Sequence, residues 1–128
     1  ILEEASWYET DVISCAAPNL RSIPGNAMNP DSSRKAVAIQ SADLLELHKK
    51  RMSRVLDIAA TKGAEVMVLG AFGCGAFQNP PAIVAEAVSG VLGGYLRCFR
   101  VIEFAVYCHM ADTRNYDVFK KVLSPLCS

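Results

Sequence analysis

The feature that most constrains the fold is a short apolar run, VMVL over residues 66–69, followed by a glycine-rich segment and a helical pattern. The run is too short for a helix and lacks polar side chains, which is typical of a strand buried inside a parallel sheet. Two further apolar runs, near 11–16 and 99–107, predict strands of the same kind. Helical patterns separate the three runs, so the order β-α-β-α-β-α predicts a three-layer α/β fold with a mostly parallel sheet.

The expected helices have recognisable ends. The pattern over 41–63 starts on a serine, the expected N-cap, and ends in Lys-Gly, which is typical of a helix C-terminus. In the pattern over 79–94, Asn followed by Pro predicts an N-cap and a first-turn proline, and Gly-Gly ends the helix. A last short helix is expected over 116–123. Residues 20–40 are rich in Pro, Gly, Asn and Ser, and so long a loop is expected to be functional or mobile.

Charge and composition exclude some classes of partner. Thirteen Lys and Arg balance thirteen Asp and Glu among 128 residues, so we expect no nucleic-acid partner and no membrane partner. The five cysteines form no C-x-x-C pair, which predicts no disulfide framework, no metal site and a reducing, cytoplasmic location. No cofactor is expected. Because the sequence opens on Ile1 rather than Met, we expect it to be a piece of a longer protein.

The glycine-rich segment, GAFGCGAFQN over residues 70–79, is where chemistry is expected. Ligands of open parallel sheets bind at the carboxyl ends of the strands. Gly70, Gly73 and Gly75 would let the backbone approach a ligand, and the N-terminus of the next helix would favour an anion such as phosphate. From these residues alone a second interpretation is equally well supported, namely a tight turn whose glycines only relieve backbone strain.

Other loop chemistries fit less well. A Walker A loop needs Lys followed by Ser or Thr where this chain has Ala76-Phe77, and the dinucleotide fingerprint lacks its third glycine. Cys74 could be a nucleophile, but no arginine follows it closely, and a half-buried structural cysteine is the preferred interpretation. His48 falls on an apolar helix face and predicts a core histidine, and His109 predicts a surface turn.

Residues 54–63, 66–80 and 84–85, with SCAAPN over 14–19, resemble the C-terminal half of the microbial-type poly(ADP-ribose) glycohydrolase family, which is macrodomain-like. That family's pattern is approximately L-G-A-W-G-C-G-V-F-x-N-x-P, from which Phe72 and Ala76 depart mildly. The resemblance implies that the loop binds the diphosphate and ribose of ADP-ribose. The ligand-binding residues that it implies are Gly70, Ala71, Phe72, Gly73, Cys74, Gly75, Ala76, Phe77 and Asn79.

The resemblance also implies a role for each part of the loop. Backbone N–H groups would hold the diphosphate, Phe77 would lie against the distal ribose, and Asn79 would cap the following helix. The N–H groups concerned are those of Gly73, Cys74, Gly75 and Ala76. The implied partner is ADP-ribose or poly(ADP-ribose), and residues 1–128 would be the C-terminal part of a macrodomain-like glycohydrolase domain.

Hydrolysis is a separate matter. The family cleaves ribose–ribose glycosidic bonds with a Gln-Glu-Glu motif, whose glutamic acid protonates the leaving group. This sequence has no Gln-Glu-Glu, so no catalytic residue is assigned, and we expect the chain alone to bind without cleaving. Two alternatives stay open: a non-catalytic structural or interaction fragment, and a thiol enzyme built on Cys74. A homodimer through an exposed strand edge is also expected.

Overall fold

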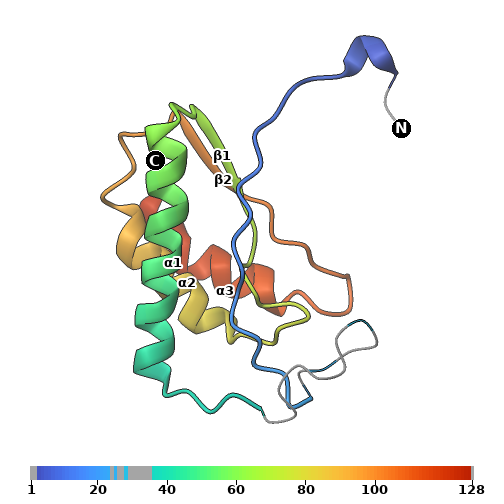
Figure 1. Cartoon of the computed structure of the whole chain (residues 1–128), viewed down its shortest axis with the longest axis vertical. Helices are drawn as coiled ribbons and strands as arrows, with labels where there is room; N and C mark the ends of the chain where they lie inside the picture. The colour runs from blue at the N-terminus through green and yellow to red at the C-terminus, as the bar shows by residue number, and fades with distance from the viewer. Residues whose placement is uncertain (1–2, 24, 26–27, 29–35, 128) are drawn as a thin grey trace.

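A computed structural model describes residues 3–23, 25, 28 and 36–127 (Figure 1). Much of the expected 20–40 loop (24, 26–27 and 29–35) lies outside these residues. The elements, in chain order, are η1 (Glu4–Ser6), α1 (Ser41–Thr61), β1 (Val66–Leu69), α2 (Pro81–Leu92), β2 (Val101–Phe104), α3 (Arg114–Leu123) and η2 (Ser124–Leu126).

The two strands pair in parallel, from Val66 opposite Val101 to Leu69 opposite Phe104. Helix α2 makes the crossover between them. This β-α-β unit confirms the α/β class and the parallel sheet. The second strand is shorter than the expected 99–107, because the sheet pairing ends at Phe104.

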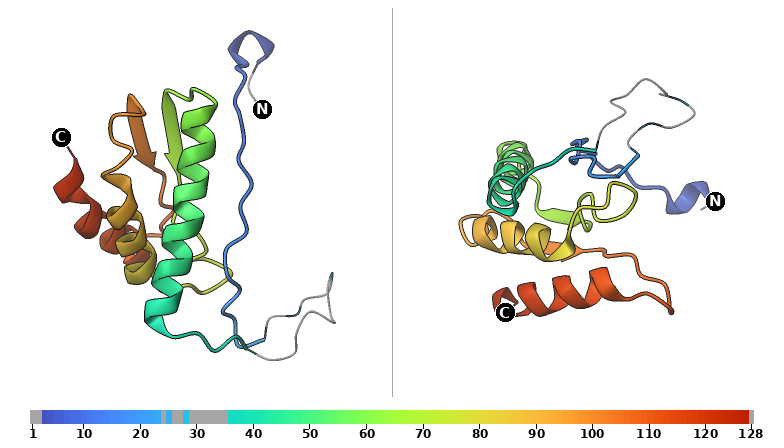
Figure 2. Two further views of the ribbon diagram at one scale, coloured as in Figure 1. Left: turned by 60° about the vertical axis from the view of Figure 1, so that its left-hand side comes forward. Right: turned by 90° about the horizontal axis from the view of Figure 1, so that it is seen from below.

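The strand expected near 11–16 is wrong for this structure. The segment runs extended beside α1 and β1 (Figure 2), but among the described residues no backbone hydrogen bond joins it to the sheet. Ile13 packs against the core, whereas Val12 is 82% exposed, so the segment contacts the core through a side chain without pairing with the sheet. Contrary to expectation, β1 is therefore not a central strand in the described part of the chain.

The helices cover one face of the sheet. In Figure 2 they lie side by side, and α1 packs on α2, which packs on α3. Met67 of β1 is buried among them, whereas Val68, on the opposite face, is 63% exposed. The described residues thus form two layers where three were expected. The core residues are Met52, Leu56, Ala59, Met67, Val84, Ala85, Val88, Leu92, Phe99, Phe119 and Leu123.

The sheet also leaves strand edges open within the described part of the chain, since it holds β1 and β2 alone. Pairing of two copies through such an edge stays a prediction. In the same residues, no helix combines the length and apolar character needed to cross a membrane.

The helix boundaries differ from expectation by one or two residues. Ser41 is the first residue of α1, not its cap, and Gln40 precedes it without a side-chain cap. The predicted C-terminal end is confirmed: Lys62 follows the helix, and Gly63 has a φ of +73°, the left-handed conformation that suits glycine. Helix α2 begins at Pro81 with Pro80 before it, so Asn79 does not cap it.

Candidate functional site

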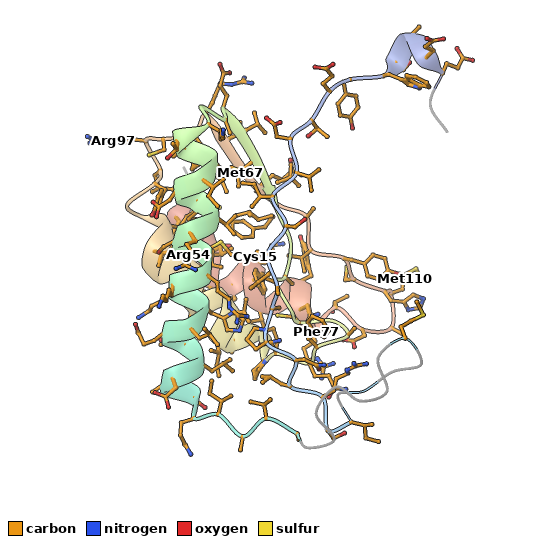
Figure 3. All side chains as sticks on the ribbon, in the orientation of Figure 1. Cys15, Arg54, Met67, Phe77, Arg97 and Met110 are labelled. Carbon is orange, nitrogen blue, oxygen red and sulfur yellow. The ribbon has the colours of Figure 1, made fainter. Side chains whose placement is uncertain are left out.

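The glycine loop, residues 70–79, leaves the carboxyl end of β1 and leads into α2. Met67 marks the strand and Phe77 the far part of the loop (Figure 3). The predicted position at the carboxyl edge of the sheet is confirmed. Gly75, Ala76, Phe77 and Gln78 are exposed, whereas Asn79 is buried.

Three backbone hydrogen bonds within the loop fix its shape. The N–H groups of Cys74, Gln78 and Asn79 donate to the carbonyls of Ala71, Gly75 and Gly73, each at 3.0 Å. The N–H of Cys74 is therefore already used, which corrects the expectation that it would point to a ligand.

The next stretch of backbone is different. The N–H groups of Gly75, Ala76 and Phe77 have no hydrogen-bond acceptor among the described residues, and all three residues are exposed. Exposed backbone N–H groups that are free in a turn can donate to an anion. The start of α2 adds fewer donors than expected, because Pro80 and Pro81 have no N–H.

Gly73 and Gly75 differ in backbone conformation and in the space that a side chain would have. Gly73 has a φ of +76°, and a Cβ there would lie 2.6 Å from both Ala17 Cβ and Asn79 Nδ2. Only glycine fits. Gly75 has no positive φ, and a Cβ on it would meet nothing within 4 Å. Relief of backbone strain, one of the two interpretations of these glycines, therefore applies to Gly73 and not to Gly75, whose open side leaves room for a ligand.

Asn79 holds the loop to two distant segments. Its Nδ2 donates to the carbonyls of Pro18 at 2.8 Å and Gly73 at 3.0 Å, and its Oδ1 lies 2.9 Å from Nε2 of His48 in α1. A backbone hydrogen bond also joins the loop to the extended segment that contains Pro18, since the N–H of Leu20 donates to the carbonyl of Phe77 at 3.0 Å. Both His48 and Asn79 are 2% exposed.

His48 is a core residue, as predicted. Its ring stands edge-on to Phe72 with 5.8 Å between centroids. Burial lowers its pKa below 6.5, Arg51 lowers it further, and the hydrogen bond to Asn79 opposes them in part. Sequence reasoning did not find the pair that His48 forms with Asn79, because no local pattern links residues 31 positions apart.

A pocket of about 490 Å³ adjoins the glycine loop. Its one ionisable side chain besides the thiol of Cys74 is that of Arg114, at the start of α3. The guanidinium of Arg114 already pairs with the carboxylate of Asp112 at 3.3 Å. Sequence reasoning missed this residue because the helix was expected to begin at Tyr116. The lining residues are Cys74, Gly75, Gln78, Asn79, Pro80, Pro81, Arg114 and Asn115.

Neither His109 nor a metal-binding cluster forms part of this site in the described part of the chain. His109 lies in an exposed turn with Asp112, as predicted. In the described part of the chain no group of His, Cys, Asp or Glu side chains could hold a metal ion.

Burial raises the pKa of the Cys74 thiol to about 11. A nucleophilic cysteine needs the opposite shift, so the thiol-enzyme interpretation is disfavoured. We expect Cys74 to be the slowest cysteine to react with iodoacetamide at pH 8, because almost none of its thiol is ionised there. Mass spectrometry of peptides against reaction time measures this. The internal controls are the exposed cysteines, Cys15, Cys98, Cys108 and Cys127. A reaction at Cys74 faster than at these cysteines would support the thiol-enzyme interpretation again.

The parallel β-α-β unit and its glycine loop define a macrodomain-like α/β protein. The chain is similar to solved structures of poly(ADP-ribose) glycohydrolase from Deinococcus radiodurans. One crystal form in complex with ADP-ribose matches with a TM-score of 0.63 and 34% identity, over 67% of this chain and 35% of that chain. The apo form has the same TM-score, 0.63, and identity, 34%, over 68% and 36%.

A second crystal form of the ADP-ribose complex has a TM-score of 0.62 and 35% identity, over 68% of this chain and 36% of that one. The resemblance to the microbial-type poly(ADP-ribose) glycohydrolases is therefore confirmed, in sequence and in fold. The chain spans about 35% of the length of the solved structure first named. No family model matches it, and no curated protein matches it significantly.

Proposed function

We propose that the glycine loop binds ADP-ribose, with the diphosphate on the backbone of the loop. The observation that carries the proposal is the run of free, exposed N–H groups at Gly75, Ala76 and Phe77. Main-chain donors attract a diphosphate without any formal charge, so a chain of zero net charge can bind it. The similar Deinococcus protein has been solved in complex with ADP-ribose, which supports this choice of ligand.

The remaining residues of the proposed site shape the loop. Gly70, Ala71 and Phe72 connect it to β1, and Gly73 makes its left-handed turn. Cys74 contributes bulk rather than its thiol, since its side chain packs against the core. Phe77, which is 36% exposed, offers an aromatic face to the distal ribose.

Binding without cleavage is the activity proposed for this chain. The sequence holds no Gln-Glu-Glu motif, and the site just described contains no carboxylate to act as a general acid. We propose that residues 1–128 form part of a macrodomain-like glycohydrolase domain whose catalytic chemistry lies outside them. The second candidate is a structural or interaction fragment that binds no nucleotide.

Gly75→Val is expected to weaken ADP-ribose binding at least tenfold, about 1.4 kcal/mol. The valine side chain would occupy the space in front of the free N–H groups. Because nothing lies within 4 Å of a Cβ at Gly75, the fold should be unaffected. Isothermal titration calorimetry of ADP-ribose against the wild type and the variant measures the change.

The matched control is Cys74→Ser, which alters the neighbouring side chain but not the donors, and it should bind like the wild type. Equal affinity for all three proteins would move the site away from the loop. If none of them binds ADP-ribose, the structural-fragment function is favoured instead. Far-ultraviolet circular dichroism of each variant checks that the fold is retained.

A further inference from the structure

We propose that His48 is a positioning residue for the glycine loop: its Nε2–H, bonded to Asn79, holds the loop in the shape that receives the ligand. The inference rests on the proposed function, since it concerns the same loop. It adds a residue from α1 that lies outside the loop and is separated from Asn79 by 31 positions.

The hydrogen bonds of Asn79 determine which ring nitrogen of His48 carries the proton. The Nδ2 of Asn79 donates to two carbonyls, those of Pro18 and Gly73, so its amide cannot be turned around. Its Oδ1 therefore faces His48 and accepts, and Nε2 of His48 must donate. In the neutral ring, the proton is therefore on Nε2.

This bond acts on the loop through Asn79. The side chain of Asn79 spans the carbonyl of Gly73, at the left-handed turn, and the carbonyl of Pro18, in the extended segment. Its own N–H closes the loop on Gly73 as well, at 3.0 Å. Without the donor of His48, Oδ1 would be buried and unpaired, at a cost of about 1–3 kcal/mol. Opening of the loop would relieve that cost by bringing Oδ1 into water, and the side chain of Asn79 would then no longer donate to the two carbonyls.

Protonation of His48 keeps the Nε2–H donor to Asn79, but it should also destabilise the closed loop. Its Nδ1 is buried with no hydrogen-bond partner among the described residues, so a second N–H there would have no acceptor. Arg51, on the same helix, adds positive potential. The segments packed around His48 supply no buried negative charge. The loop has the neutral thiol of Cys74, Glu86 of α2 is exposed, and residues 16–19 hold no ionisable side chain.

The charge of the imidazolium would therefore lack a buried counter-ion. Because the pKa of His48 in the fold is lowered below 6.5, the unfolded or locally opened chain binds a proton more readily than the folded one. The closed loop is then fully stable above about pH 6.5 and loses stability as the pH falls towards the lowered pKa.

The test compares three proteins by calorimetric titration of ADP-ribose between pH 5.5 and 8. Wild-type affinity should fall several-fold towards pH 5.5. His48→Gln keeps an amide N–H donor but cannot be protonated, so it should bind within about threefold of the wild type at pH 8 and show no such fall. His48→Leu keeps the apolar volume but has no donor, and it should bind at least tenfold more weakly at every pH.

The control for the pH profile is His109→Gln, which removes the exposed histidine and should leave the profile unchanged. A ligand-independent readout separates this inference from the proposed function. Nitrogen-15 chemical shifts of the His48 ring should show the Nε2–H form at pH 8, and backbone amide exchange at Asn79 should accelerate in His48→Leu and not in His48→Gln. If the wild type binds no ADP-ribose while these signals appear, the proposed function fails and the positioning of the loop by His48 stands.

Two results would overturn the inference. One is an Nδ1–H tautomer. The other is a folded His48→Leu protein with wild-type affinity and pH profile. If His48→Leu does not fold, the pH profile of His48→Gln decides, because a profile like that of the wild type would exclude the role of His48.

Discussion

Gly73→Ala is expected to lower the free energy of unfolding by about 3 kcal/mol, which combines the cost of the left-handed backbone with that of overpacking. The φ of +76° disfavours any residue with a Cβ, and that Cβ would lie 2.6 Å from both Ala17 Cβ and Asn79 Nδ2. Neither neighbour can move cheaply, because Ala17 has no flexible side chain and Asn79 is held by its hydrogen bonds.

Chemical denaturation followed by circular dichroism measures this loss. Gly93→Ala is the matched control, because Gly93 has a φ of −54° and nothing within 4 Å of its would-be Cβ. The control should change the free energy of unfolding by less than about 0.5 kcal/mol. A loss that small at Gly73 would contradict the left-handed turn.

Asn79→Ala should destabilise the protein by about 3 kcal/mol or more, because removing one partner leaves buried groups unsatisfied at about 1–3 kcal/mol each. The groups concerned are His48 Nε2 and the carbonyl of Pro18, since the carbonyl of Gly73 keeps its bond from the backbone N–H of residue 79. The segment around Pro18 would lose its tie to the loop. The backbone amide of Leu20, which donates to the carbonyl of Phe77, should then exchange faster with solvent.

Asn79→Asp tests the accepting oxygen and the donating nitrogen of this side chain separately. The aspartate can still accept from His48, but it cannot donate to the two carbonyls, so it should restore little of the lost stability. Asn115→Ala, at the rim of the neighbouring pocket, is the surface control and should have a small effect. Unfolding by denaturant gives the energies, and amide exchange locates the opening. Unchanged exchange at Leu20 in Asn79→Ala would mean that the segment is held by other contacts.

Local patterns predicted the helices and the β-α-β unit well. The run over 66–69 is apolar at every position, and the Lys-Gly pair after α1 has the chemistry that a helix end requires. These features depend on neighbouring residues alone. The strand near 11–16 failed because its place depends on partners elsewhere: its apolar residues are divided between the core at Ile13 and solvent at Val12.

The site was predicted in position but not in detail. Glycine spacing located the loop, yet it could not show that Gly73 is crowded and Gly75 open. The Asn-Pro pair suggested a helix cap, whereas Asn79 is drawn into the core by residues 31 and 61 positions away. Contacts over such separations leave no periodic or compositional signal in a single sequence.

The ties of Asn79 have a consequence for protein engineering. Residues 70–79 have a compact sequence signature and invite transplantation onto another parallel sheet as a ready-made anion receptor. A graft of that peptide alone would lack Ala17 and Pro18, against which Gly73 and Asn79 are fitted, and the donor of His48. The smallest transferable unit is therefore discontinuous: the loop, the extended segment across it and one turn of the long helix behind it.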